Sequence, residues 1–247
     1  MPSPSPVQPF TTSPSAHTTG TDPDDHRVRV AAQRRERMRM RLIESALHVF
    51  AEKGIDATDI KDVIEAAQVS RGSFYNYFQT NDELMGAVLQ ELGNELLALV
   101  DAVVTKRRDP AERVACGLRM VLRTASQHPL LARFVSRAGI HMVAGNSLAM
   151  QYLPRDIQTG LAQGHFHAQQ PLAALTMTLG TAHAALCAMA MSDSLPADFP
   201  EEVAFQVLLG LGVRRAKARA VVSQAIEAVS LPADALLART HSPTVTA

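Results

Sequence analysis

Two short helical patterns lie between Thr58 and Phe78, separated by only three residues. The first pattern repeats apolar residues at helical spacing, namely Ile60, Val63, Ile64 and Ala67. Thr58 precedes it and offers a hydroxyl suited to an N-cap, and Ser70 stands in the same position before the second pattern. In that second pattern Phe74 and Phe78 are four residues apart and share one face. Two short helices joined by so tight a turn predict a helix-turn-helix.

Longer helices are expected on both sides of this motif. Upstream, one apolar face ends at Lys53-Gly54, and its residues are Leu42, Ala46, Val49 and Phe50. Downstream, Thr80 and Glu83 have the spacing of a capping box, and apolar residues every four positions predict a long helix to about Thr105. Further helices are expected to begin at Asp109-Pro110, near His128-Pro129, near Asn146, at Gln170-Pro171, at Phe199-Pro200 and at Gly212-Val213.

The composition favours an all-α fold, because Trp is absent, aromatic residues are only 4% of the chain, and long stretches lack proline and glycine. A length of 247 residues suits two domains. We expect a three-helix helix-turn-helix DNA-binding domain at 34–84 and a larger helical ligand-binding and dimerisation domain at 85–238. Residues 1–33 are expected to be a disordered Ser/Thr/Pro-rich tail and basic arm, and residues 239–247 a disordered C-terminus.

Positive charge is concentrated just before the motif. The formal net charge is zero, yet 27–41 holds one acid, Glu36, and seven arginines, at 27, 29, 34, 35, 37, 39 and 41. From Gly54 to Asn81, by contrast, two cations face four acids. The run is either a solvated helix start or a surface that neutralises phosphates.

The second short helix has the residue types that major-groove recognition requires. Small side chains at Ser70, Gly72 and Ser73 would let its backbone approach closely. Arg71 can donate two hydrogen bonds to a guanine edge or to phosphate, and Tyr75 is long enough to reach a phosphate. Asn76 and Tyr77 are further outward candidates, although the tyrosines could instead be packing residues. Phe74 and Phe78 are assigned to the core.

The segment Thr58–Leu84, TDIKDVIEAAQVSRGSFYNYFQTNDEL, closely resembles the helix-turn-helix of the tetracycline-repressor (TetR) family of transcriptional regulators, and with the preceding helix the likeness covers roughly 39–88. The resemblance implies an operator DNA partner. It also implies phosphate contacts from Tyr75 and from Thr58 and Lys61 at the start of the first short helix, although Lys61 could be only a solvated charge. Three departures stand out: Gln68 at a turn position usually held by Gly, Ile64 for a usual Ala, and Asn81 for a usual phosphate-binding Lys.

The rest of the chain gives architecture but little chemistry. Soft apolar or weakly polar residues on several helices are candidates for a ligand cavity, with plain core as the alternative: Met120, Phe134, His141, Met142, Met150, Phe166, Met177 and His183. His165 and His167 lack a third ligand, so no metal is expected. Cys116 and Cys187 have no CxxC spacing, which suits a reducing cytoplasm.

A stripe of small residues repeats every fourth position at Thr176, Gly180, Ala184 and Ala188, within the uncharged stretch 172–191. We interpret this stretch as a buried helix of a soluble protein rather than a membrane span. Together with Phe205, Leu208, Leu209 and Leu211, the stripe suits a four-helix bundle like the one that joins TetR subunits, although internal packing is the alternative.

The sequence therefore predicts a cytoplasmic, nucleoid-associated homodimer that represses from a near-palindromic operator and responds to an unidentified small molecule, without a cofactor, a metal or a membrane partner. Two other hypotheses remain at this stage. One is a constitutive or architectural DNA-binding regulator without a ligand. The other is a helical enzyme that carries the motif, although no nucleophile with a nearby base and no phosphate loop can be placed.

Overall fold

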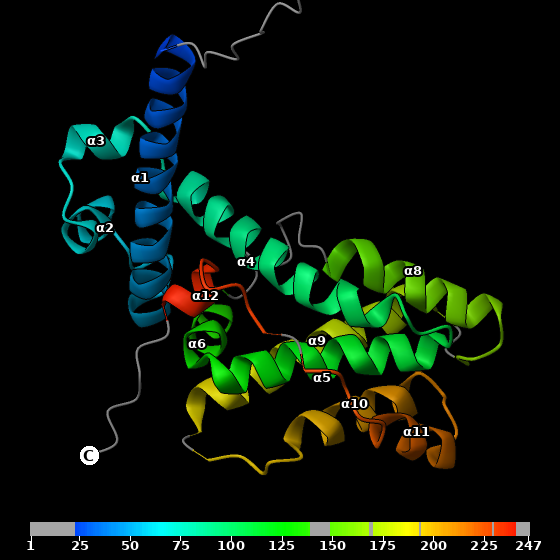
Figure 1. Cartoon of the computed structure of the whole chain (residues 1–247). Coiled ribbons are helices and arrows are strands. Elements are labelled where there is room, and N and C mark those ends of the chain that lie inside the picture. The colour runs from blue at the N-terminus through cyan, green and yellow to red at the C-terminus, as the bar shows by residue number, and fades with distance from the viewer. Residues whose placement is uncertain (1–22, 139–148, 168–169, 193, 229, 241–247) are drawn as a thin grey trace, which may run out of the picture. The chain divides into compact units, whose positions relative to one another are not determined.

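A computed structural model describes residues 23–138, 149–167, 170–192, 194–228 and 230–240 (Figure 1). Every regular element in these ranges is a helix, which confirms the predicted all-α class. The helices are α1 (Pro23–Lys53), α2 (Ile60–Ala67), α3 (Arg71–Tyr75), α4 (Asn81–Val104), α5 (Pro110–Gln127), α6 (Pro129–Ala138), α8 (Ala149–Ala162), α9 (Pro171–Met191), α10 (Phe199–Gly210), α11 (Arg215–Val222) and α12 (Leu236–Arg239).

Most of the predicted boundaries are confirmed because local chemistry sets them. The long helix α4 ends at Val104, with Thr105 as its C-cap. Proline occupies the first turn of α5, α9 and α10, where its missing N–H costs no hydrogen bond. At the start of α4 the Thr80 hydroxyl accepts the Glu83 N–H, as expected, but the Glu83 carboxylate accepts the N–H of Gln79 instead of that of Thr80.

The first helix is longer than predicted. It begins at Pro23, so residues 23–33, expected to belong to an irregular tail and arm, are helical. The physical reason is that proline suits a first helical position and that 27–41 contains no glycine or proline to stop a helix. The stretch before Arg39 forms a unit of its own, in which the side chains of 27–37 are all exposed.

From Arg39 onward the helices share one extended hydrophobic cluster. In the DNA-binding head this cluster includes fully buried Leu42, Ile43, Leu47, Phe50 and Phe74. It continues along α4 into the larger domain, where α5 packs against α4, α8 and α10, and α6 packs against α9 (Figure 1). Because α4 belongs to both regions, it is the structural link between the head and the larger domain.

The turn between α2 and α3 contains a left-handed residue. Gln68 has φ 52° and ψ 47°, and it is the one non-glycine residue with positive φ in the described ranges. Its N–H donates to the Glu65 carbonyl, and the Val69 N–H donates to the Ile64 carbonyl. These two bonds form a Schellman motif, which normally places glycine at the left-handed position. The turn thus keeps the left-handed geometry that glycine normally provides, with glutamine in its place.

Candidate nucleic-acid interface

The start of α3 is fixed by two serines. The Ser70 hydroxyl accepts the Ser73 N–H at 3.1 Å, and the two hydroxyl oxygens lie 2.9 Å apart. A serine cap of this kind fixes the first turn of a short helix. Because Gly72 between them is exposed, and a Cβ there would meet only the Ser70 hydroxyl oxygen at 4.0 Å, the backbone at the amino end of α3 is accessible.

Arg71 and Tyr75 form a pair on the outer face of α3. They are one turn apart, with the Arg71 Nη2 3.5 Å from the Tyr75 hydroxyl and the guanidinium carbon 5.7 Å from the ring centroid. Arg71 is exposed and Tyr75 is half-buried. The tyrosine ring also meets Phe74 edge-on, with centroids 5.5 Å apart. Tyr75 thus packs against the core on one side and supports Arg71 on the other.

The predicted inward face of this motif is confirmed, since Phe74 and Phe78 are buried. Helix α3 is shorter than the sequence suggested: it ends at Tyr75, with Asn76 as its C-cap. Asn76 and Tyr77 therefore lie in the turn that follows the helix, where Asn76 is exposed and Tyr77 is half-buried.

The predicted role of Thr58 as an N-cap is wrong. Asp59 occupies the N-cap position of α2, and its N–H donates to the Asp62 carboxylate at 3.0 Å. Thr58 is buried, and its hydroxyl donates to the Gly54 carbonyl at 2.6 Å. The hydroxyl therefore faces the loop after α1 instead of an approaching phosphate. Lys61 remains exposed and lies 3.6 Å from the Glu65 carboxylate.

Asn81 has a structural contact that the sequence did not reveal. Its side-chain amide donates to the carbonyl of Thr58, tying the start of α4 to the loop before α2. The two residues are 23 positions apart, so no local pattern indicated the bond. Ile64, the second departure from the family pattern, is half-buried and packs against the core of the head.

One arginine of the basic run also has an internal contact. The Arg39 guanidinium lies 3.1 Å from the Glu91 carboxylate of α4, and both side chains are partly buried. Arg34, Arg35 and Arg37 are exposed. Arg39 is thus part of the α1–α4 junction, whereas these three arginines are available to solvent.

The predicted ligand-cavity residues do not form one site. Phe134 and Phe166 are buried in the main cluster, while Met120 belongs to a separate small cluster with Leu99 and Val103. Met177 packs against Gly210 of α10, and the His183 ring nitrogen Nε2 lies 3.5 Å from the Cys187 sulfur on the same helix. These contacts are typical of core packing. His141 and Met142 lie outside the described residues, and so does the side chain of Met150.

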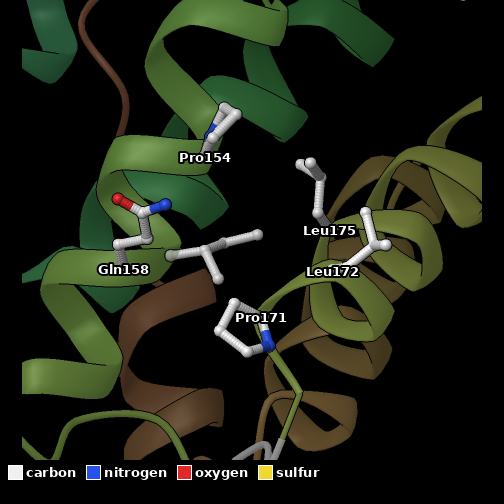
Figure 2. Close-up of a pocket in the computed structure, with 6 residues that line it drawn as sticks. Pro154, Gln158, Pro171, Leu172 and Leu175 are labelled. Carbon is white, nitrogen blue, oxygen red and sulfur yellow. The ribbon is translucent and has the colours of Figure 1, made fainter.

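Figure 2 shows an apolar hollow between α8 and α9 that the sequence did not predict. Its volume is about 250 Å³, and the side chains of Pro154 and Gln158 face those of Pro171, Leu172 and Leu175 across it. Gln158 is the one polar residue of this lining, but the surface that faces the hollow is almost entirely apolar. Leu172 lies one turn before Thr176 on α9, but a leucine does not continue a stripe of small residues, so no sequence pattern indicated this hollow.

The stripe on α9 faces outward in the single chain. Thr176, Gly180 and Ala184 are exposed, and a Cβ at Gly180 would meet nothing within 4 Å. By length and composition α9 is the one described helix that could cross a membrane, and only 22% of its most apolar stretch is buried. The prediction of a buried helix is therefore wrong for the isolated chain.

The prediction of a dimer surface on and just after α10 is also wrong in part. Phe205, Leu208 and Leu211 are fully buried within the chain, and the Arg219 guanidinium covers the Phe205 ring at 3.7 Å. The opposite face of α10 contains half-buried Val203 and Leu209 and exposed Gln206. Only Leu209 of the predicted α10 residues lies on this accessible face.

His165 has charged neighbours instead of metal ligands. Its Nδ1 lies 3.0 Å from the Asp109 carboxylate, which also binds Lys217 at 2.7 Å and accepts the Ala111 N–H. Burial alone would raise the pKa of Asp109, but the hydrogen bonds from Lys217 and Ala111 outweigh it and hold the pKa below its usual value. Within the described ranges, no group of three or more His, Cys, Asp or Glu side chains could hold a metal ion.

Together, the head and its exposed α3 define a helix-turn-helix DNA-binding protein. Comparison with known proteins identifies the class further. Residues 42–88 match the domain "Bacterial regulatory proteins, tetR family", and residues 109–224 match "Tetracyclin repressor-like, C-terminal domain". The chain belongs to the TetR family of transcriptional regulators.

Individual relatives agree with this assignment. The HTH-type transcriptional repressor Rv3405c of Mycobacterium tuberculosis is 38% identical over 135 residues, which are 48% of this chain and 72% of the repressor. The repressor DhaR of a Mycobacterium species is 33% identical over 76 residues, 31% of this chain and 38% of DhaR. The structure of RolR in complex with resorcinol is 33% identical, covers 81% of this chain and 100% of RolR, and has a TM-score of 0.63.

Proposed function

We propose that this chain is a ligand-responsive repressor that binds a near-palindromic operator as a homodimer. The observation that carries the proposal is the exposed Arg71–Tyr75 pair on a serine-capped α3. Arg71 would contact a base edge or a phosphate, and Tyr75 would contact phosphate and steady Arg71. Gly72, Asn76, Tyr77 and Lys61 are proposed to be further contacts.

Dimerisation is proposed through α9 and the accessible face of α10. Regulators of this family bind operator DNA as dimers. Small residues allow two helices to approach closely, and an uncharged helix with an open stripe at Gly180 needs a partner surface to cover it. We therefore assign α9 to a protein interface instead of a membrane, in a regulator that acts on DNA in the cytoplasm, associated with the nucleoid.

An effector is proposed because RolR, whose whole length matches 81% of this chain, is known in complex with resorcinol. The hollow between α8 and α9 is lined almost entirely by apolar surface, which suits a small apolar ring. A constitutive regulator without an effector is less well supported, because the relatives include ligand-bound regulators. The relatives are transcriptional regulators, which are not enzymes.

The recognition helix provides the test. A duplex would first be selected from random DNA by the wild-type protein. Arg71→Ala should weaken binding to it by about 1–3 kcal/mol and relax base preference, while Tyr75→Phe should weaken binding to all sequences alike. Gln163→Ala, at an exposed position in the turn after α8, is the control. Unchanged affinity in both α3 variants, measured by gel shift at about physiological salt, would reject α3 as the reading element.

A further inference from the structure

The C-terminal segment of the chain, residues 230–240, returns to the junction between the head and the larger domain. Its short helix α12 packs against α4 (Figure 1). Leu236 and Leu237 are fully buried and belong to the same hydrophobic cluster as Leu42 and Ile43 of α1. The segment thus packs on α4 as part of the main hydrophobic cluster, although the sequence assigned residues 239–247 to a disordered end.

Glu95 of α4 binds this segment directly. One carboxylate oxygen accepts the Leu236 N–H, and the other accepts the Leu237 N–H at 3.2 Å. An ionised carboxylate makes stronger hydrogen bonds to N–H groups than a neutral acceptor does. Partial burial raises the pKa of Glu95, and the two N–H bonds oppose this rise.

Two ion pairs complete the junction. At the end of α12, Arg239 lies 3.9 Å from the Glu44 carboxylate of α1. One turn before Glu95, Glu91 binds Arg39 of α1. Glu91 and Glu95 are one turn apart on α4. Glu91 contacts α1 directly, whereas Glu95 binds the C-terminal segment, which in turn contacts α1 through Arg239.

We propose that Glu95 is a positioning residue that clamps residues 230–240 between α4 and α1 and thereby fixes the angle between the DNA-binding head and the larger domain. This inference rests on the proposed function, because it concerns the geometry with which a dimer reads two half-sites. A fixed head angle sets the half-site spacing that the dimer accepts. An effector that moves α4 must then also strain or release this clamp.

The first experiment measures the clamp without DNA. Spin labels at exposed Ala66→Cys in α2 and exposed Gln127→Cys at the end of α5, in a Cys187→Ser background, report the head-to-domain distance. Glu95→Gln keeps the size of the side chain but replaces one acceptor oxygen with an NH₂ group. This group is a donor, so it cannot accept one of the two backbone N–H bonds. It should broaden the distance distribution at least about twofold and speed amide exchange at Leu236 and Leu237 roughly tenfold or more. Asp101→Asn, which neutralises another acid of α4, should change neither.

The second experiment measures the consequence for operator choice. Wild-type protein and variants are titrated with a selected duplex and with the same duplex carrying one extra base pair between the half-sites. We expect the wild-type penalty for the insertion, about tenfold or more, to fall to roughly threefold in Glu95→Gln. A residue that only supports stability would weaken binding to both duplexes equally.

A milder variant covers the case in which Glu95→Gln does not fold. Arg239→Glu places two acids together at Glu44 and should loosen the head, while the exchanged pair Glu44→Arg with Arg239→Glu should restore the wild-type distances. An unchanged distance distribution in whichever single variant folds would overturn the clamp. If wild-type protein shows no preference between the two duplexes, the proposed paired half-sites fail, and the label distances still decide the clamp.

Discussion

Arg39 and Glu91 form an ion pair between α1 and α4, with 3.1 Å between nitrogen and oxygen. Arg39 belongs by sequence to the basic run, but its guanidinium binds Glu91 of α4. The run therefore contains residues of two kinds. Arg34, Arg35 and Arg37 are exposed along α1 and are the candidates for phosphate contact.

This division predicts different salt effects. Replacing Arg34, Arg35 and Arg37 together with Gln should weaken DNA binding and flatten the log–log salt slope by about 0.9 for each side chain that touches phosphate. Arg39→Gln should leave the slope unchanged and lower the free energy of unfolding by about 0.2–1 kcal/mol, the range for partly exposed pairs. Titration at several salt concentrations checks both. A triple variant with the wild-type slope would mean that the run is only a solvated helix end.

The left-handed Gln68 predicts a stabilising substitution. Left-handed backbone costs a residue with a Cβ about 1–2 kcal/mol, whereas glycine avoids that cost but loses roughly 0.5–1 kcal/mol through its more flexible unfolded state. Gln68→Gly should therefore raise the free energy of unfolding by about 0.5–1 kcal/mol. Gln68→Ala, which keeps the Cβ, is the matched control and should gain nothing. Equal urea midpoints for the two variants would contradict the strain at this turn.

Gly160 of α8 predicts the opposite outcome for a glycine substitution. A Cβ there would lie 2.2 Å from the ring of Phe166, which is 2% exposed and cannot easily move away. Gly160→Ala should cost about 1–3 kcal/mol through overpacking, despite the better helix propensity of alanine. Gly93→Ala on α4, where a Cβ meets nothing within 4 Å, should instead be stabilising. Thermal unfolding of the two variants gives the comparison.

The dimer surface on α9 is tested by a charge at its centre. Gly180→Glu should split the dimer, because a carboxylate in a close helix contact loses its hydration without gaining a partner. Gly86→Glu places the same residue at an exposed glycine of α4 that also has open space, and it should stay dimeric. Light scattering measures both masses. A dimeric Gly180→Glu variant would exclude this stripe from the interface.

The lowered pKa of Asp109 predicts how stability depends on pH. A carboxylate whose folded pKa lies below its unfolded value of 3.8 stabilises the fold above that value and loses this contribution as the pH falls through the folded pKa. Lys217→Met removes the ammonium partner and should lower the free energy of unfolding by about 1 kcal/mol at pH 7, after allowance for solvent screening. The difference from wild type should shrink below about pH 3.8. Lys217→Arg, followed by urea unfolding over the same pH range, is the control.

The sequence by itself determined the elements whose causes are local. Caps, proline positions and repeats every three or four residues fixed α4, α5, α9 and α10, and the family pattern located α3 with its outward Arg71. The left-handed backbone of Gln68 is also local in origin, because its Schellman bonds join residues within one turn of α2, but the sequence marked this position only as a departure from the usual Gly. Hydrogen bonds and steric limits over a few residues are the same in any tertiary context.

Only the tertiary structure decided which side chains of different helices contact each other and which faces are buried. Arg39 meets Glu91 across 52 residues, and Glu95 meets Leu236 across 141, so neither pair leaves a periodic pattern in the sequence. Phe205 illustrates the same point: α10 is apolar on more than one face, and packing against Arg219 buried the face that the sequence had assigned to a partner. Burial depends on how helices cross in space, and periodicity within one helix cannot specify that arrangement.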